Sequence, residues 1–220
     1  MNADPHPLFF KERLAMVEDQ LRRRGIGDLR VLAAMTKVPR HEFVGHESWP
    51  DAYADHPVPI GEQQTTSQPY IIAAMLQAAE VAPQDRVLEI GAGSGYQTAL
   101  LAELAAEVFA VERHAALADH ARATLACLGY QNATVISGDG SVGLPEHAPY
   151  DAIIVAAAAP RVPPALLEQL APEGRLVVPV GDAHQQVLQL ARKRRDGTVV
   201  VHPLEGCRFV PLIGRQGFGT

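Results

Sequence analysis

The sequence "RVLEIGAGSGYQTALL", residues 86–101, contains three glycines between an apolar run and a helix-like run. Its first part is a short apolar run typical of a buried β-strand, and its last part has the pattern of a helix. Gly91, Gly93 and Gly95 lie between the two, where they permit a tight turn and let a ligand approach the backbone without meeting a Cβ atom. Taken alone, this loop is also compatible with a simple strand-to-helix turn.

Strand-like and helix-like segments alternate from residue 85 onward. Strand-like segments span 86–91, 107–113, 133–139, 150–159 and 174–181, and helix-like segments span 95–105, 114–129 and 163–171. Strict alternation of this kind builds a doubly wound α/β sheet with right-handed crossovers. The pattern changes at the end of the chain, where 185–193 and 198–204 flank an Asp-Gly turn and predict an antiparallel hairpin.

Two helices are predicted before this core. The first, over residues 12–25, places Leu14, Val17 and Leu21 on one face and ends at a glycine. The second, over residues 28–38, begins with an Asp as its N-cap and ends before a proline.

The chain shows no internal repeat and no low-complexity tail. A Pro-rich segment, 49–66, reads as irregular structure. We expect one domain over residues 1–220. Its expected parts are an N-terminal addition with a substrate-side loop (1–66), a ligand-binding core (67–181) and a C-terminal hairpin and tail (182–220).

Composition and charge narrow the class of protein. The chain has 220 residues, of which 47% are hydrophobic and 20% charged, as in an ordinary globular protein. Its net charge of −6 argues against a nucleic-acid-binding surface, and the one basic run, 191–197, reads as an exposed hairpin end. No apolar run approaches the ~20 residues of a membrane span, and the N-terminus lacks a signal-peptide pattern. Cys127 and Cys207 suggest neither a disulfide framework nor a zinc site, so we expect a cytoplasmic protein.

The spacing of the glycines narrows the choice of ligand. The dinucleotide fingerprint G-x-G-x-x-G would place its third glycine at Tyr96, whereas this chain has it one residue earlier, at Gly95. No Gly-Lys-Ser/Thr follows, so the loop is not a P-loop, and a nicotinamide-dependent dehydrogenase is disfavoured. Glu89 precedes the loop, where a carboxylate suits a cationic ligand better than a pyrophosphate. The resulting pattern, E-x-G-x-G-x-G, is typical of S-adenosyl-L-methionine (AdoMet) methyltransferases.

Two more carboxylates lie at the ends of the next two strands. Glu112, in "AVER", could accept hydrogen bonds from both hydroxyls of a ribose. Asp139, in "SGDG", could accept one from an adenine amino group, and it also fits an Asp-Gly turn. Small side chains follow the fourth strand in "AAAAP", residues 156–160, and either leave room for a substrate or pack tightly. Three acidic residues at successive strand ends favour a ligand at the carboxyl edge of the sheet.

Two other catalytic patterns are excluded. In "HEFVGH", His41 and His46 are five positions apart, one too many for the zinc-protease helix motif. The chain contains no G-x-S-x-G, which argues against an esterase.

The polar stretch "GEQQTTSQPY", residues 61–70, precedes the apolar run "IIAAML". Ser67 and Pro69 predict a helix start there, with Ser67 as its N-cap. A helix N-terminus presents unpaired N–H groups and a partial positive charge, and both favour an anion. We therefore expect Ser67 to cap the helix and, with Thr65, to hold a carboxylate. The alternative is that Ser67 only caps the helix and does not contact the substrate.

The chain resembles the bacterial protein-L-isoaspartate O-methyltransferases over residues 14–213. The resemblance lies in the glycine stretch and in "PIGEQQTTSQPYI", "VERH", "GDGSVGLPEHAPYDAIIVAAAAPRVPPALLEQL", "GRLVVPVG" and "RFVPLIG". It implies the Rossmann-like class I methyltransferase fold: a doubly wound, mostly parallel seven-stranded sheet with an antiparallel C-terminal hairpin and an N-terminal helical addition. It also implies methyl transfer from AdoMet to the free α-carboxylate of L-isoaspartyl residues in damaged proteins, with S-adenosyl-L-homocysteine (AdoHcy) as product. The ester then collapses to a succinimide without the enzyme, and hydrolysis returns some normal aspartate.

The resemblance also implies roles for individual residues. In this family the serine of the T-x-S-x-P segment is the active-site residue, which is Ser67 here, with Thr65 as its upstream hydroxyl neighbour. The cofactor-binding positions are Glu89, Gly91, Ala92, Gly93, Gly95, Glu112, Asp139 and Gly140. Relatives often carry Gly where this chain has Gln63, so we expect a stiffer loop here. We expect no metal, a monomer, isoaspartyl proteins and peptides as partners, and no nucleic-acid or membrane partner.

Two alternatives share the same cofactor. One is an AdoMet-dependent carboxyl methyltransferase acting on a small acid or a specialised peptide. The other is a non-catalytic AdoMet-binding protein, which the presence of both 61–70 and "RFVPL" disfavours. "AAAAP" stands where amide and nucleobase methyltransferases carry an N-P-P-Y-like motif, which argues against their chemistry. A carboxylate is already ionised at neutral pH, so the lack of an obvious catalytic base fits carboxyl methylation.

Overall fold

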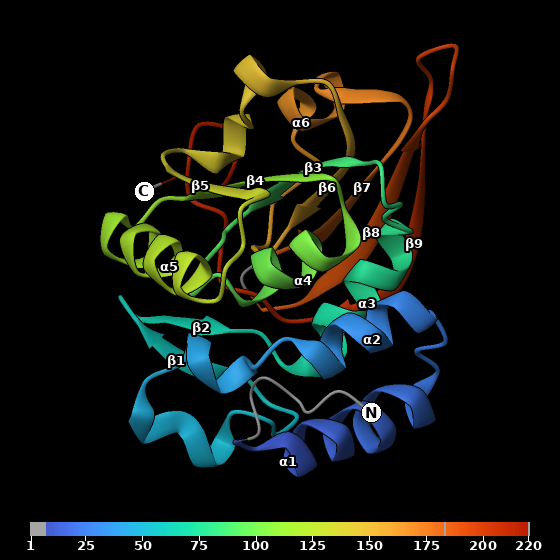
Figure 1. Ribbon diagram of the computed structural model, residues 1–220. Coiled ribbons are helices and arrows are strands. Elements are labelled where there is room, and N and C mark those ends of the chain that lie inside the picture. The colour runs from blue at the N-terminus through green and yellow to red at the C-terminus, as the bar shows by residue number, and fades with distance from the viewer. Residues whose placement is uncertain (1–7, 183, 220) are drawn as a thin grey trace.

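The computed structural model describes residues 8–182 and 184–219. A central sheet carries helices on both faces (Figure 1), and its seven strands lie in the order β5-β4-β3-β6-β7-β8-β9. The pairs from β5 through β7 are parallel, and β8 and β9 continue the sheet as antiparallel strands. The predicted doubly wound sheet and its antiparallel C-terminal hairpin are confirmed.

The strands and helices have the following bounds. Its strands are β3 (Arg86–Ile90), β4 (Glu107–Glu112), β5 (Ala133–Ser137), β6 (Tyr150–Val155), β7 (Leu170–Gly181), β8 (Gln186–Lys193) and β9 (Val199–Cys207). The helices are α1 (Phe10–Ala15), α2 (Leu29–Lys37), α3 (Pro69–Ala79), α4 (Tyr96–Leu104), α5 (Ala115–Cys127) and α6 (Pro164–Glu168). Short 3₁₀ turns cover Arg22–Arg24, Arg40–Phe43, His46–Asp51, Gly140–Val142 and Pro145–His147. Because β3 has β4 on one side and β6 on the other, the order switches beside β3, where open α/β sheets bind their ligands.

Alternate residues of each strand face opposite sides of the sheet. On β3, Val87 lies in the core shared with α3, α4 and α5, whereas Leu88 lies in the core shared with α6. Both side chains are fully buried. Glu89 therefore faces the same side as Val87, toward α4. Because both faces are covered, the central strands are near-continuous apolar runs in the sequence.

An N-terminal layer containing α1 and α2 lies against α3 and α4 (Figure 1). Helix α1 continues as a π-helical turn, Met16–Leu21. The prediction of its buried face is wrong at Leu14, which is 40% exposed, although Val17 and Leu21 are buried. A π-turn holds more residues than an α-turn, so it rotates the later residues away from the face that an ideal helix would present. Asp28 caps α2 as predicted.

The prediction of irregular structure over 49–66 is wrong in part. This segment contains a hairpin of β1 (Val58–Gly61) and β2 (Gln64–Thr66). Both residues of its turn, Glu62 and Gln63, have positive φ angles, 50° and 58°. Two-residue turns of this kind normally use Asn-Gly or Asp-Gly, and the pattern is hidden because this chain uses neither. Gln63 thus occupies a left-handed position that favours glycine.

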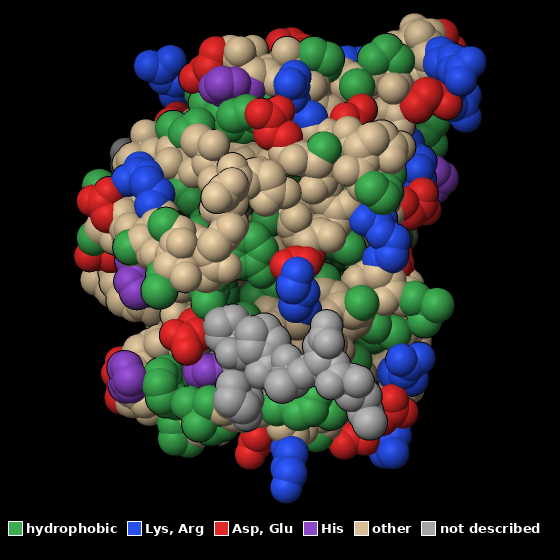
Figure 2. Space-filling model, viewed as in Figure 1, with side chains coloured by type: hydrophobic (Ala, Val, Ile, Leu, Met, Phe, Trp, Pro, Cys, Tyr) green, Lys and Arg blue, Asp and Glu red, His purple; other side chains and the backbone are tan. Residues whose placement is uncertain are grey.

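The surface carries charges of both signs. On the face seen in Figure 2, Lys and Arg side chains are interspersed with Asp and Glu. The tip of the β8–β9 hairpin, residues 194–197, is exposed, as predicted for the basic run. No helix within 8–182 and 184–219 is long and apolar enough to cross a membrane. The first seven residues, where the sequence shows no signal-peptide pattern, lie outside the described residues.

Candidate active site

The glycine loop joins β3 to α4 at the carboxyl edge of the sheet. Gly91, Gly93 and Gly95 have φ angles of 88°, 54° and 90°, a region that L side chains rarely adopt. The N–H groups of Gly91 and Ala92 donate to the carbonyl of Val111, at 2.8 and 3.3 Å, and tie the loop to β4. The backbone therefore requires glycine at the three positions that the sequence singled out.

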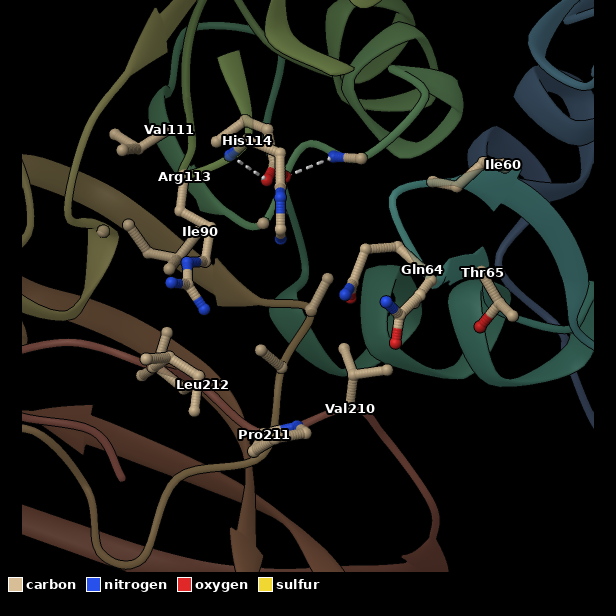
Figure 3. Close-up of a pocket in the computed structure, with 18 residues that line it drawn as sticks. Ile60, Gln64, Thr65, Ile90, Val111, Arg113, His114, Val210, Pro211 and Leu212 are labelled. Carbon is tan, nitrogen blue, oxygen red and sulfur yellow. Dashed lines mark hydrogen bonds between the residues drawn. The ribbon is translucent and has the colours of Figure 1, made fainter. Parts of the chain in front are cut away.

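A cavity of about 240 Å³ lies over this loop (Figure 3). Ile90 and Val111 line it from the ends of β3 and β4, and Gly91 and Gly93 line it from the loop. Ile60, Thr65 and Gln64 border it from the β1–β2 hairpin, and Val210, Pro211 and Leu212 border it from the C-terminal segment (Figure 3). The lining combines apolar side chains with polar and charged ones that can orient a ligand, as in many small-molecule sites.

Glu112 supplies a buried carboxylate to this cavity and is 5% exposed. Its Oε2 accepts a hydrogen bond from the Gly93 N–H and its Oε1 accepts one from the His114 N–H, both at 2.9 Å (dashed lines in Figure 3). A carboxylate has about four acceptor positions, so each oxygen retains one for a ligand. The two oxygens are therefore held in place and can accept from two neighbouring hydroxyls.

Glu89 lies on the side of the loop that faces α4 and is fully buried. Its carboxylate accepts hydrogen bonds from Gln97 Nε2, at 3.0 Å, and from Thr98 Oγ1. Burial raises the pKa of Glu89 to about 8, although the hydrogen bonds from Thr98 and Gln97 act in the opposite direction. Both donors are neutral, so a cationic ligand group would stabilise the ionised carboxylate.

Glu89, Ala92 and Ser67 meet at a second, smaller cavity of about 40 Å³. Gly91, Gly93 and Thr65 line both cavities, so the two lie side by side. Most of the predicted site residues therefore come together around the glycine loop.

Gly95 and Asp139 line neither of these two cavities, but they hold neighbouring segments in place. At Gly95, a Cβ atom would lie 3.1 Å from the Cβ of Ala121, so this glycine lets α5 pack closely against the start of α4. Asp139 Oδ1 accepts from the Ser141 N–H (2.9 Å) and hydroxyl (2.6 Å), and Oδ2 accepts from the Arg215 N–H (3.0 Å). Burial raises the pKa of Asp139, but these hydrogen bonds outweigh it and lower the pKa overall.

Asp139 thus braces the C-terminal tail, and its neighbour Gly140 lines the larger cavity. A Cβ atom at Gly140 would lie 2.6 Å from Cγ2 of Ile90 in the cavity wall. The prediction that Asp139 accepts a hydrogen bond from an adenine amino group stays a prediction.

The prediction that Ser67 is the N-cap of α3 is wrong. The cap position is Gln68, and no side chain there accepts a hydrogen bond from the first turn. Because Pro69 occupies the first helical position and has no N–H, the turn needs one partner fewer. The Ser67 carbonyl instead accepts a hydrogen bond from Arg40 Nη2 at 2.7 Å. Ser67 is thus held by its backbone, and its hydroxyl is not used for capping.

Sequence reasoning missed the residues that close the cavity. The N–H of Ala158 donates to the carbonyl of Val210 (2.8 Å), and the N–H of Leu212 donates to the carbonyl of Ala158 (2.7 Å). These bonds seat "RFVPL" beside the segment "AAAAP", and the small side chains there permit the close approach. Arg113 and His114, which directly follow Glu112, also line the cavity. The "VERH" and "RFVPL" segments were the available signals.

The cavity presents groups that can position a ligand. Within the described residues, no group of three or more His, Cys, Asp or Glu side chains could hold a metal ion. The cavity combines apolar walls, a fixed carboxylate and glycine backbone, which fit the adenine, ribose and amino-acid parts of AdoMet. The hydroxyl-bearing segment 65–67 borders both cavities, where an acceptor could approach.

Known protein-L-isoaspartate O-methyltransferases are similar to this chain over nearly its whole length. The sequence model of the protein-L-isoaspartate(D-aspartate) O-methyltransferase family, PCMT, matches residues 11–217. A protein-L-isoaspartate O-methyltransferase from Koribacter versatilis is 57% identical over 210 residues, which cover 96% of this chain and 94% of the relative. One from Methanoculleus marisnigri is 54% identical over 219 residues, with coverages of 99% and 97%.

Solved structures of protein-L-isoaspartate O-methyltransferases are also similar to this chain. A protein-L-isoaspartate O-methyltransferase structure has a TM-score of 0.83 and 29% identity, covering 93% of this chain and 67% of that one. A Plasmodium falciparum chain assigned to the same enzyme, in complex with AdoHcy, has a TM-score of 0.79 and 27% identity, covering 90% and 97%. The chain therefore belongs to the protein-L-isoaspartate(D-aspartate) O-methyltransferase family.

Proposed function

We propose that this chain transfers the methyl group of AdoMet to the free α-carboxylate of L-isoaspartyl residues in damaged proteins and peptides. One observation carries this proposal. Thr65 lines the cavity over the glycine loop and also a surface groove of about 740 Å³ between α3 and the C-terminal segment. A donor in the cavity and a peptide in the groove would meet at this hairpin. Family membership supports this choice of donor and acceptor.

The residues around the cavity have distinct proposed roles toward the donor. AdoMet supplies an electrophilic methyl group on a positively charged sulfur. Glu112 would accept hydrogen bonds from the two ribose hydroxyls, because each of its oxygens retains an acceptor position. Glu89 would face the cationic amino-acid part from the smaller cavity. The glycine loop, with Ala92, and Gly140 would let the ligand approach the backbone closely.

The acceptor needs orientation and loss of water rather than activation. Its carboxylate is ionised at neutral pH, so no general base is required. Ser67 and Thr65 would hold the carboxylate so that one oxygen points at the methyl carbon, and the positive end of α3 would favour the anion. Excluding water strengthens these contacts and frees the nucleophile from its hydration shell.

The runner-up function is carboxyl methylation of a small acid or a specialised peptide, which would use the same donor site. Mass spectrometry of an isoaspartyl peptide incubated with AdoMet separates the two. The repair function predicts a transient gain of one methyl group, followed by accumulation of the succinimide and of the normal aspartyl peptide. An unmodified peptide, together with turnover of a free dicarboxylic acid, would support the runner-up.

We propose a single methyltransferase domain with parts 1–66, 67–181 and 182–220, because one buried core joins the N-terminal layer to a face of the sheet. We also propose a cytoplasmic monomer that acts on polypeptides and not on nucleic acid or at a membrane. The net charge of −6 and the free thiols of Cys127 and Cys207 support this. Light scattering would check the oligomeric state.

A further inference from the structure

Arg40 lies beneath the substrate side of the site and is 0% exposed. Its guanidinium donates three hydrogen bonds in three directions. Nε donates to the carbonyl of Ala52 (2.7 Å), Nη2 to the carbonyl of Ser67 (2.7 Å) and Nη1 to Oγ1 of Thr66 (3.3 Å). All three acceptors are neutral oxygens, so these hydrogen bonds do not pair the positive charge, which the carboxylate of Asp55 stabilises from outside them.

The same guanidinium also contacts the donor side of the site. Its Cζ lies 4.7 Å from the centroid of the Tyr96 ring, within the range of a cation–π interaction. Tyr96 is buried and is the first residue of α4, directly after the glycine loop. One side chain therefore joins the segment that carries Ser67 to the end of the loop that borders the donor cavity.

Burial of this charge calls for an explanation. A buried charge is costly unless it is paired and hydrogen-bonded. Arg175 shows the common arrangement, because it is also mostly buried but forms an ion pair with Asp85. Arg40 donates to neutral acceptors instead, and the carboxylate of Asp55, which forms an ion pair with Arg24, also favours its charged form. A lysine could not match these hydrogen bonds, since only the planar guanidinium donates along three fixed directions.

We propose that Arg40 is a positioning residue for methyl transfer: it fixes Ser67 relative to the glycine loop and makes the surroundings of the bound carboxylate more positive. This inference rests on the proposed function, which places the isoaspartyl carboxylate at Ser67. Arg40 acts through Ser67 and Tyr96 and does not itself activate the substrate. A small misplacement of reacting groups can lower the rate by up to about a hundredfold, so loss of the contacts of Arg40 should be visible in kcat.

Arg40→Lys and Thr66→Val test the inference with little change in volume. Lys keeps the charge but loses the planar fork, and Val removes one of the three acceptors. Arg175→Met is the matched control. Arg175 donates to the carbonyls of Ala79 and Glu80 at the opposite end of α3, so its loss weakens the same helix away from the site.

Three measurements are made on each variant: kinetics with an isoaspartyl peptide, the affinity for AdoHcy, and hydrogen exchange of the backbone amides of 64–68. Arg40→Lys should lower kcat/KM about tenfold or more, mainly through kcat, and speed the amide exchange. Its AdoHcy affinity should stay within about threefold of wild type. Thr66→Val should show a smaller change of the same kind, and Arg175→Met should lower the Tm with kcat/KM unchanged.

Wild-type kcat/KM and unchanged amide exchange in Arg40→Lys would overturn the inference, and so would equal kinetic losses in Arg40→Lys and Arg175→Met. If Arg40→Lys fails to fold, Thr66→Val decides in the same way. The exchange measurement does not depend on turnover. In one further outcome, the wild-type enzyme leaves the isoaspartyl peptide unmodified while amide exchange is still faster in Arg40→Lys than in wild type. That outcome would refute the proposed function but would still support the contact between Arg40 and Ser67.

Discussion

Replacing Glu112 by Gln should weaken cofactor binding by a predictable amount. In the native protein each carboxylate oxygen accepts one backbone N–H at 2.9 Å and retains one position for a ribose hydroxyl. In Glu112→Gln one oxygen becomes an NH₂ group, which cannot accept from either the backbone or the ligand, and the negative charge is lost. Hydrogen bonds to charged groups contribute roughly 1.5–3 kcal/mol, so the affinity for AdoHcy should fall about ten- to a hundredfold.

Isothermal titration calorimetry with AdoHcy, well below the Tm of each variant, measures this loss directly. Glu107→Gln is the matched control, because Glu107 lies at the other end of β4, is 46% exposed and pairs with Arg86 at the surface. Its affinity for AdoHcy should equal that of wild type. A folded Glu112→Gln protein with wild-type affinity, or a wild-type protein that binds NAD, would refute the assignment of Glu112 to the ribose.

Three further predictions concern the loop and the acceptor side. Ser67→Ala should lower kcat/KM for an isoaspartyl peptide about tenfold or more while the Tm barely changes, because Ser67 makes no capping bond; full activity would remove Ser67 from the site. Glu89→Gln should gain stability relative to wild type at about pH 9 but not at about pH 4, by a few kcal/mol at most. The pKa of Glu89 rises from 4.5 to about 8 in the folded protein, so between these pH values the folded state holds a proton that the unfolded state has lost. Wild type therefore loses stability as the pH rises from 4.5 to about 8. An equal difference in the free energy of unfolding between Glu89→Gln and wild type at both pH values would count against this. Gly91→Ala should cost about 1–2 kcal/mol, since φ is 88° there, and an unchanged Tm would contradict the strain argument.

Local patterns account for the parts of the fold that the sequence predicts. The glycine loop, the alternating strands and helices and the Asp28 cap each depend on a few neighbouring residues, so they can be read without knowing the rest of the chain. The β1–β2 hairpin was missed because Glu62 and Gln63 adopt positive φ without the residues that usually mark such a turn. Leu14 was misplaced because a π-turn changes the helical period after it.

In the site, too, residues in local patterns could be predicted from the sequence, whereas contacts between distant segments could not. Glu112 and Gly91 could be selected because they lie at strand ends, and parallel strands bring those ends to one edge. The contacts of Asp139 with Arg215 and of Ser67 with Arg40 could not be predicted, because these partners are far apart in sequence. Such contacts are set by packing between elements, which a local pattern does not contain.

The nature of the methyl acceptor can be tested by comparing two peptides. Two synthetic peptides with the same residues, one with isoaspartate and one with aspartate, are assayed with AdoMet and wild-type enzyme. Isoaspartate carries its carboxylate on Cα, whereas aspartate carries it one methylene away, so a site that positions backbone and carboxylate together should separate them. We expect a kcat/KM ratio of about a hundred or more in favour of the isoaspartyl peptide. Equal values for the two peptides would contradict it.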